Sequence, residues 1–386
     1  MMWEVYENML PILFRDRMQF QNIILHLTLI DGVGPVALHS LVTKLGQDRL
    51  HEIYNFFVSD FVAFGVSPSA AQILVDGLKN QEILDQEIAL MEQFHVQILT
   101  ILCSQFPALL KEIHVPPALL YFQGDVKLFA HEKNIACVGA RKSHGYAHEA
   151  LLHLIVPMVE QGWVVVSGGA LGADTFAHQI ALDHQSPTMV VVGSGLSQVY
   201  PAQNAKLFEN VVRAGGLIIS SFPMQTPPDP WNFPKRNRLI AGLSRGCLVL
   251  QAADKSGALI TASCALEQGR EVFAVPGSIF DPLSAGCHSL IAQGAKLVTC
   301  AQDLLDELGY PVVESKKDQQ SLFVPAKAEK LDEISRQILQ TAFTPMTIDF
   351  MASKLQIDVH FLQNKLFELS LEGKIVQDAM GFWKRV

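Results

Sequence analysis

Six apolar runs in the middle of the chain share one pattern. Each is short and rich in β-branched residues, and each is bounded by glycine or serine. Because their apolar positions are continuous rather than alternating, the runs predict strands that are buried on both faces. Helical patterns such as Ala258–Gln268 lie between them, so we predict a doubly wound, mainly parallel α/β sheet. The six segments are Asn134–Arg141, Trp163–Asp174, Thr188–Gly195, Gly216–Ser221, Gly246–Gln251 and Glu271–Gly277.

The segments that flank this sheet predict smaller, mostly helical domains. Near the N-terminus, two helical patterns are joined by the Gly-x-Gly-Pro turn at Gly32. After a polar stretch without any period, which is typical of a linker, three helical patterns precede a small hairpin, the outline of a winged helix. We therefore predict a helical domain at 1–95, a Rossmann-like domain at 96–310, a linker at 311–330 and a winged-helix-like domain at 331–386.

Both flanking domains have two interpretations. A helix-hairpin-helix turn can bind a DNA phosphate through its amides, whereas a sterile-α-motif-like domain packs or contacts proteins. The second interpretation is favoured, because no Lys or Arg follows Gly32-Val-Gly34 until Lys44. The would-be recognition helix of the winged-helix-like domain carries Lys365 but also Glu368 and Glu372, which suits a major groove poorly. Protein contact or weak duplex contact is the expectation there.

Composition narrows the possible classes of function. The chain has 29 Lys+Arg against 38 Asp+Glu, but residues 135–300 hold 11 and 10, so any nucleic-acid binding requires a local site. No apolar run is long enough for a membrane span, and charges near the N-terminus interrupt any signal peptide. Six cysteines without a C-x-x-C pair and 13 histidines without metal-site spacing predict buried thiols in a cytoplasmic protein without a metal or cofactor.

The segment Asn232–Ile240 carries the strongest chemical signal. It places three cations, Lys235, Arg236 and Arg238, beside the aromatic Phe233 and the amide of Asn237. Cations neutralise a phosphate backbone, and an aromatic face lets a base stack. A surface loop with structural ion pairs is the alternative for arginines in this pattern.

Several glycine-containing turns are predicted at the same edge of the sheet. Ligands of parallel sheets bind beyond the carboxyl ends of the strands, where loop amides and helix N-termini point outward. The turn after Trp163–Val166 departs from the G-x-G-x-x-G spacing, which disfavours NAD. His178, on the helix that follows, reads as a packed group rather than a catalyst. The residues expected at this edge are Gly139, Arg141, Ser167, Gly168, Gly169, Ser256 and Gly257.

These segments together resemble the DNA-processing protein A family (DprA, also called Smf). The resemblance covers roughly residues 100–305. Four positions depart from the family pattern: Ser221 and Gln251 replace acids, and Gly169 and Ala173 replace larger apolar residues. The matching segments include Phe106-Pro107, Pro116–Tyr121, Val138–Arg141, Ser167–Asp174 with Ala177-His178, Tyr200-Pro201 with Asn204, Phe233–Arg238, Ser256–Thr261, Val275–Gly277 and Gly286–His288.

The resemblance implies a non-enzymatic protein that binds single-stranded DNA in natural transformation. Family members also load the RecA recombinase onto this DNA and form homodimers through the Rossmann-like domain. In this chain Arg141 would contact a phosphate, the amides of Ser167, Gly168 and Gly169 would hold another, and Lys206 would line the same groove. Phe233 would stack on a base, and Arg236 and Arg238 would clamp the backbone, with a structural role for one of these two arginines as the alternative.

A nucleotide hydrolase of the lysine-decarboxylase-like (phosphoribohydrolase) type is the competing class. It shares the sheet and the phosphate-binding turns, and it typically shows Pro-Gly-Gly-x-Gly-Thr with a nearby glutamate. The nearest match here is Ser256–Thr261 with Glu267, without the Pro-Gly-Gly start. No Ser-His-Asp order, paired carboxylate or Walker A motif is present, so no catalytic residue is expected.

Overall fold

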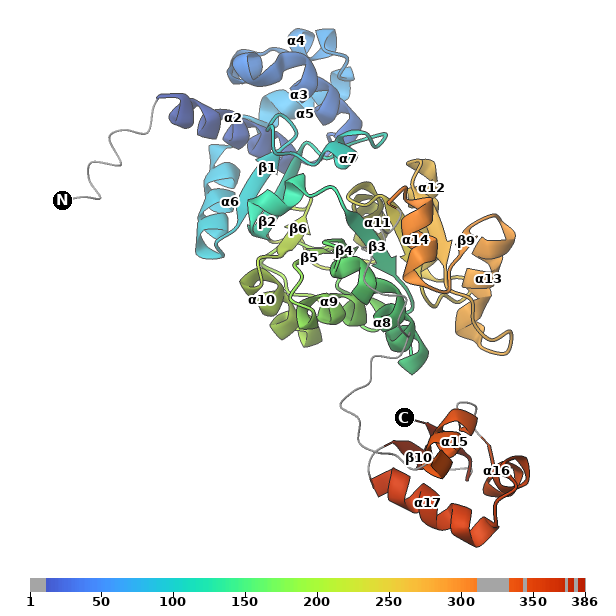
Figure 1. The fold of residues 1–386 in the computed structure, drawn as a ribbon. Coiled ribbons are helices and arrows are strands. Elements are labelled where there is room, and N and C mark those ends of the chain that lie inside the picture. The colour runs from blue at the N-terminus through green and yellow to red at the C-terminus, as the bar shows by residue number, and fades with distance from the viewer. Residues whose placement is uncertain (1–11, 311–332, 343–345, 372–373, 378–380, 386) are drawn as a thin grey trace, which may run out of the picture. The chain divides into compact units, whose positions relative to one another are not determined.

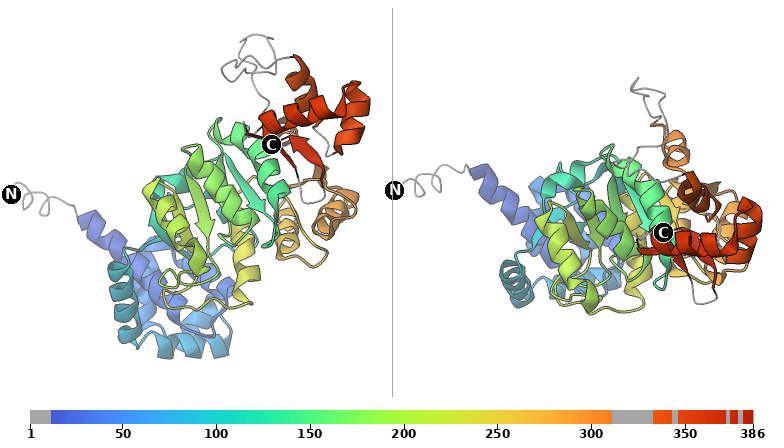
Figure 2. Two further views of the ribbon diagram at one scale, coloured as in Figure 1. Left: turned by 90° about the horizontal axis from the view of Figure 1, so that it is seen from below. Right: turned by 60° about the horizontal axis from the view of Figure 1, so that its bottom comes forward.

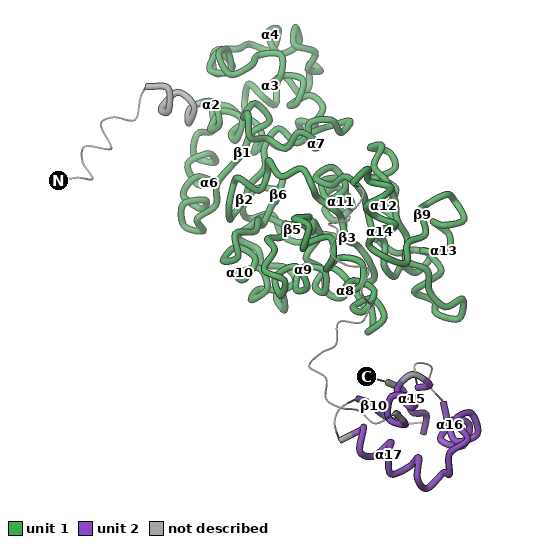
Figure 3. Tube along the Cα trace, in the orientation of Figure 1, with its two compact units in different colours: residues 1–313 green, residues 314–386 purple. Residues whose placement is uncertain are grey.

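The computed structural model describes residues 12–310, 333–342, 346–371, 374–377 and 381–385. The chain divides into two compact units, residues 1–313 and residues 314–386 (Figure 3). We describe each unit by itself.

A nine-stranded sheet forms the centre of the first unit, in the order β1-β2-β6-β5-β4-β3-β7-β8-β9 (Figure 1). The six predicted runs are β3 to β8, which pair in parallel, and β9 adds in parallel to β8. The mainly parallel α/β fold is thus confirmed. An antiparallel edge, in which β2 pairs with β1 and β6, was not predicted. The strands are β1 (Gln97–Thr100), β2 (Leu119–Gly124), β3 (Asn134–Val138), β4 (Val164–Ser167), β5 (Thr188–Val191), β6 (Leu217–Ser220), β7 (Gly246–Val249), β8 (Glu271–Ala274) and β9 (Lys296–Leu297).

Helices cover both faces of this sheet (Figure 2). Along β3, Ile135 and Cys137 belong to a buried cluster with α8, α9 and α14, whereas Ala136 and Val138 belong to a cluster with α11 and α12. Successive side chains of a strand point to opposite faces, so apolar residues are needed at every position. The helices are α7 (Ala108–Lys111), α8 (Gly145–Val159), α9 (Ala173–Asp183), α10 (Ala205–Arg213), α11 (Asn232–Gly242), α12 (Gly257–Glu267), α13 (Ala285–Ala292) and α14 (Ala301–Glu307).

The N-terminal helices pack onto the antiparallel edge of the sheet. Their buried residues, such as Phe20 and Leu84, belong to the same hydrophobic core as Phe122 of β2. The predicted Gly-x-Gly-Pro turn separates α2 from α3, with Gly32 at a φ of 88° that favours glycine. A domain boundary after residue 95 stays a prediction, because this core is continuous across it. The helices are α2 (Ile12–Leu29), α3 (Pro35–Arg49), α4 (Val58–Ala63), α5 (Pro68–Gly77) and α6 (Gln81–Gln93).

The second unit has its own hydrophobic core. Leu362, Leu366 and Leu369, which recur at helical spacing, pack with Ile338 and Met351. The predicted three helices and hairpin are observed, and the winged-helix assignment stays a prediction. The elements are α15 (Glu333–Thr341), α16 (Ile348–Leu355), α17 (Val359–Leu371), β10 (Ile375–Gln377) and β11 (Trp383–Arg385). Among the residues that the structure describes in both units, no helix is long and apolar enough to cross a membrane.

Tyr310 closes the first unit. Its amide donates to Leu305 O at 2.9 Å, and its ring meets the fully buried Trp163 edge-on at 5.2 Å between centroids. We therefore expect a protein that ends at Tyr310 to keep the thermal stability of the first unit. A protein that ends at Leu308 should lose about 0.5–1.5 kcal/mol with the aromatic pair. Chemical denaturation of the two truncated proteins measures this, and equal free energies of unfolding would contradict it.

Candidate nucleic-acid interface

The backbone that leaves β3 carries an exposed arginine. At Gly139 a Cβ would lie 2.7 Å from the Cβ of Ala173, so glycine lets α9 approach the strand end. Arg141 then projects into solvent, and its guanidinium carbon lies 5.3 Å from the centroid of the Phe233 ring. A cation within about 6 Å of an aromatic centroid is attracted to the ring. An exposed cation and an aromatic ring are therefore adjacent, and their predicted roles in binding a phosphate and a base stay predictions.

The glycine turn after β4 is held by a carboxylate. The amides of Gly168 and Ala170 donate to Asp174 Oδ2 at 3.1 and 3.2 Å. The hydroxyl of the fully buried Ser167 donates to Cys137 O at 2.6 Å. Contrary to the prediction, the Gly168 amide is therefore not free for a phosphate, and Ser167 faces the interior. At other glycine turns of this kind, the backbone amides bind the oxygen of an anionic ligand. Here the carboxylate of Asp174 accepts those hydrogen bonds instead.

The cationic segment forms helix α11 rather than a surface loop. Successive residues of a helix point about 100° apart, so neighbouring cations reach different surroundings. Lys235 is exposed, whereas Arg236 is only 5% exposed. Pro234 is tolerated here because it lies in the first turn, where no intrahelical N–H bond is lost.

Arg236 is a buried structural cation. Its Nη1 donates to Gly168 O at 2.7 Å and to Val191 O, and its guanidinium carbon lies 5.8 Å from the Phe233 centroid. Burial lowers the pKa of Arg236 to about 10, although the charge of Asp174 raises it. Burial also raises the pKa of Asp174, against the effect of Arg236. Arg236 thus joins α11 to the glycine turn, and it does not clamp a DNA backbone as predicted.

The resulting groove consists of two adjoining hollows of about 50 and 210 Å³, which share Arg141, Ala170, Phe233 and Arg236. Tyr200 lines the smaller hollow, with its ring centroid 5.8 Å from that of Phe233. Of the predicted site residues, the structure brings together Gly139, Arg141, Gly168, Phe233, Arg236, Asn237, Ser256 and Gly257.

The other predicted residues lie outside the lining of both hollows. The half-buried Arg238 donates one hydrogen bond, from its Nη1 to Val115 O, and its predicted contact with a strand stays a prediction. Lys206 and Lys235 are exposed and can contact a ligand only beyond the groove. The predicted residues outside the lining are Ser167, Gly169, Lys206, Lys235 and Arg238.

Comparison with known proteins decides the family. A model described as DNA recombination-mediator protein A matches residues 97–309, which is more than half of the chain. The chain belongs to this family. The DNA processing protein DprA of Bacillus subtilis (strain 168) is 40% identical over 242 residues, which are 61% of this chain and 81% of that protein.

Solved structures of family members share the fold. DNA processing protein A from Streptococcus pneumoniae aligns with a TM-score of 0.65 and 33% identity, covering 74% of this chain and 97% of that one. DNA processing protein A from Helicobacter pylori aligns with a TM-score of 0.50 and 30% identity, covering 56% and 97%. That structure is described as giving insight into a unique single-stranded DNA binding mode.

Three residues in or beside the groove of this mediator-family member were not among the predicted site residues. Asp174 appeared only as part of a matching segment, although an acid in the first turn after a glycine turn is a signal for capping. The exposed Lys142 and Lys255 were not named, although each adjoins a predicted residue, Arg141 or Ser256. These two cations add positive charge beside the groove.

His178 is a packed group, as expected. Thr188 donates its hydroxyl hydrogen to Val165 O at 2.7 Å, so its oxygen accepts the Nδ1–H of His178 at 2.8 Å. The Nε2 of His178 is buried and makes no hydrogen bond within the described part of the chain. Burial and, to a lesser extent, the charge of Arg236 lower the pKa of His178 to about 3. Among the described residues, no group of three His, Cys, Asp or Glu is placed to hold a metal.

Arg236 and Arg141 should behave differently on substitution. Arg236→Ala leaves the buried Asp174 without its cation, so we expect it to lower the free energy of unfolding by about 3–5 kcal/mol. Arg141→Ala changes an exposed side chain and should cost less than about 0.5 kcal/mol. Urea denaturation of both variants makes the comparison. Equal small losses would show that Arg236 is not a structural cation.

His178 should make stability depend on pH. Its folded pKa of about 3 lies below its ordinary value of 6.5, so the stability that rests on neutral His178 is fully present above pH 6.5. This stability is lost as the pH falls from 6.5 towards 3, by up to about 1.4 kcal/mol per pH unit. In His178→Gln, which can still pair with Thr188, the decline should be shallower. Unfolding free energies measured from pH 7 to 4.5 test this, and parallel curves would refute it.

Proposed function

We propose that this mediator-family protein binds single-stranded DNA across the groove between the ends of β3 and α11. The observation that carries the proposal is the exposed Arg141 beside two aromatic rings, Phe233 at 5.3 Å and, next to it, Tyr200. An arginine can pair with a phosphate, and a flexible strand can turn its bases onto aromatic rings, whereas a stiff duplex cannot. The single-stranded DNA binding described for the Helicobacter pylori relative supports this proposal.

The groove lacks the groups that hydrolysis would require, which supports binding without catalysis. Asp174 is the one acidic residue among the described residues that line the groove. Its carboxylate already accepts hydrogen bonds from two backbone amides and lies beside Arg236. A general base must reach the proton that it removes, and this carboxylate is buried. Glu267 is the acid that would correspond to the glutamate of a phosphoribohydrolase. It is exposed and does not line the groove.

The family resemblance implies two further properties, which we propose for this chain. It would load a RecA-type recombinase onto single-stranded DNA, and it would form a homodimer through the Rossmann-like domain. Light scattering measures the mass in solution. Recombinase ATPase activity on DNA covered by single-strand binding protein measures loading, and no stimulation by this protein would contradict the proposed role.

Arg141→Ala should weaken binding of oligothymidylate by about 1–3 kcal/mol, because one charge-assisted contact is lost. The slope of log affinity against log salt should fall by about 0.7. Arg49→Ala is the matched control, since it removes an exposed arginine paired with Glu52 at the end of α3. Fluorescence anisotropy at several salt concentrations gives both values. If the two variants bind alike, Arg141 is not a phosphate contact.

The same groove should prefer single strands over duplex by at least about tenfold at equal salt, with little dependence on sequence, because the contacts are to backbone and base faces. Competition between unlabelled single-stranded and duplex DNA of equal length measures this ratio. Equal affinity would shift the binding site to another surface, such as that of the second unit.

A further inference from the structure

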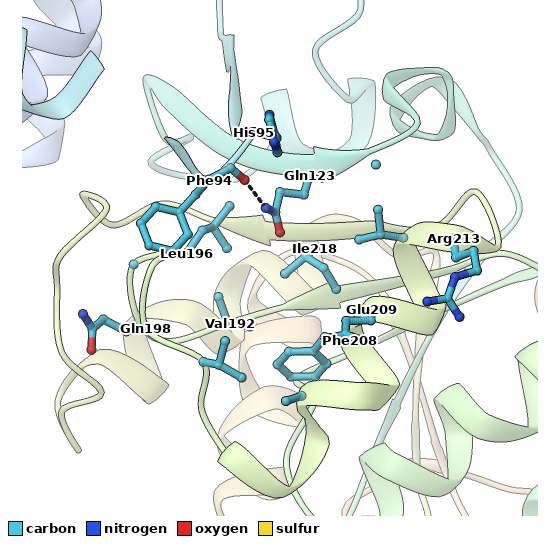
Figure 4. A pocket seen from close by; sticks show the side chains of 15 residues that line it. Phe94, His95, Gln123, Val192, Leu196, Gln198, Phe208, Glu209, Arg213 and Ile218 are labelled. Carbon is cyan, nitrogen blue, oxygen red and sulfur yellow. Dashed lines mark hydrogen bonds between the residues drawn. The ribbon is translucent and has the colours of Figure 1, made fainter. Parts of the chain in front are cut away.

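A second pocket, of about 500 Å³, lies beside α10 and is not used by the groove described above (Figure 4). Its buried lining is apolar and comes from the loop after β5, from α10 and from β6: Val192, Leu196, Phe208 and Ile218. Pockets of this size and composition typically bind small, largely apolar groups with a few polar contacts.

The polar groups of the pocket suit a flat heteroaromatic ring. The side-chain N–H of Gln123 donates a hydrogen bond to Phe94 O, with 2.5 Å between nitrogen and oxygen. Figure 4 shows the side-chain oxygen of Gln123 turned towards the pocket. This oxygen can accept a hydrogen bond from an amine, while the Phe94 and Phe208 rings offer aromatic surface. The two charged residues of the lining, Glu209 and Arg213, are exposed, so the buried part of the pocket is formed by apolar side chains.

The pocket and the DNA groove share one wall, the loop 192–201. Leu196 and Val199 line the pocket, and the adjacent Tyr200 lines the groove beside Phe233. Val199 and Tyr200 are 52% and 41% exposed, so two neighbouring residues of the loop offer apolar surface, one at the pocket and one at the groove.

We propose that this pocket holds one unstacked nucleobase of the bound strand. The proposal rests on the proposed function, since the strand must first occupy the groove at Arg141. Its backbone then crosses the loop 192–201, and one base inserts beside Phe208 and Gln123. The protein thereby holds two separate bases, one at Phe233 and one in the pocket, which keeps the intervening strand from stacking on itself.

Ala205 lines the pocket at the start of α10, so Ala205→Trp would fill it. We expect this variant to bind oligothymidylate at least about fivefold more weakly, since one stacked base is lost. The salt slope should not change, because no phosphate contact is removed. Ala214→Trp is the matched control, because Ala214 is exposed at the other end of the same helix and does not line the pocket.

Binding by wild type, Arg141→Ala and Ala205→Trp separates an error in the pocket assignment from an error in the proposed function. If wild-type protein does not bind oligothymidylate, the proposed function is wrong. If Arg141→Ala weakens binding but a folded Ala205→Trp binds like wild type, only the pocket inference is wrong. Thymidine monophosphate that raises the melting temperature of wild type but not of Ala205→Trp, with unchanged strand affinity, would also overturn it, by assigning the pocket to a free nucleotide.

A measurement on the unaltered protein avoids any folding defect of the variant. Oligonucleotides that carry iododeoxyuridine are cross-linked by light, and the modified peptides are identified by mass spectrometry. Cross-links at Phe94 or Phe208, in addition to those at Phe233 and Tyr200, are expected. Cross-links confined to Phe233 and Tyr200 would refute insertion of a base into the pocket.

Discussion

The groove depends on one buried cation. The guanidinium of Arg236 and the carboxylate of Asp174 both pack against Gly168. A Cβ at this position would lie 2.8 Å from each group, so only glycine leaves room for the two charges. Each charge would be costly to bury alone, so α11, α9 and the turn after β4 must come together in one arrangement. That arrangement sets the position of Phe233 on α11 and, through Gly139 against α9, the direction in which Arg141 leaves the sheet.

The parallel centre of the sheet was predictable because its strands are covered on both faces. Continuous β-branched runs such as Val164–Val166 can hardly have another explanation once helices alternate with them. In the antiparallel edge, β2 is as apolar as the central strands, so its composition did not reveal the direction of its pairing, and β1 begins at the exposed Gln97. Short strands at a sheet edge depend on the helices that pack on them, which sequence pattern alone does not reveal.

The candidate site was predicted in outline but not residue by residue. Arg236 and Arg238 look equivalent in the sequence, yet one is buried under the groove and the other bonds Val115 O. Their difference follows from the helical conformation of α11, which the prolines around it obscured, and from the face that this helix turns to the sheet. Asp174 likewise acquires its role only when the turn closes on it. Such assignments require tertiary contacts.

Gln251, which replaces an acid of the family pattern, lies among polar side chains that suit an amide. The Gln251 amide donates to Asp281 Oδ2 at 3.1 Å, and Asp281 also pairs with His144 at 3.0 Å. A carboxylate at 251 would face that of Asp281 at hydrogen-bond distance, where like charges repel. Glutamine instead joins the end of β7 to the loop before α13 and to the start of α8.

The contact between Arg141 and Phe233 also matters when no strand is bound. Exposed aromatic surface tends to attract other proteins and promotes aggregation. Here the guanidinium of the exposed Arg141 lies over the ring, and a charged, hydrated group is presented to solvent in its place. The guanidinium of Arg141 thus covers part of the Phe233 ring in the protein without ligand. In the proposed complex, the same side chain would both contact a phosphate and have to leave the ring on which a base stacks.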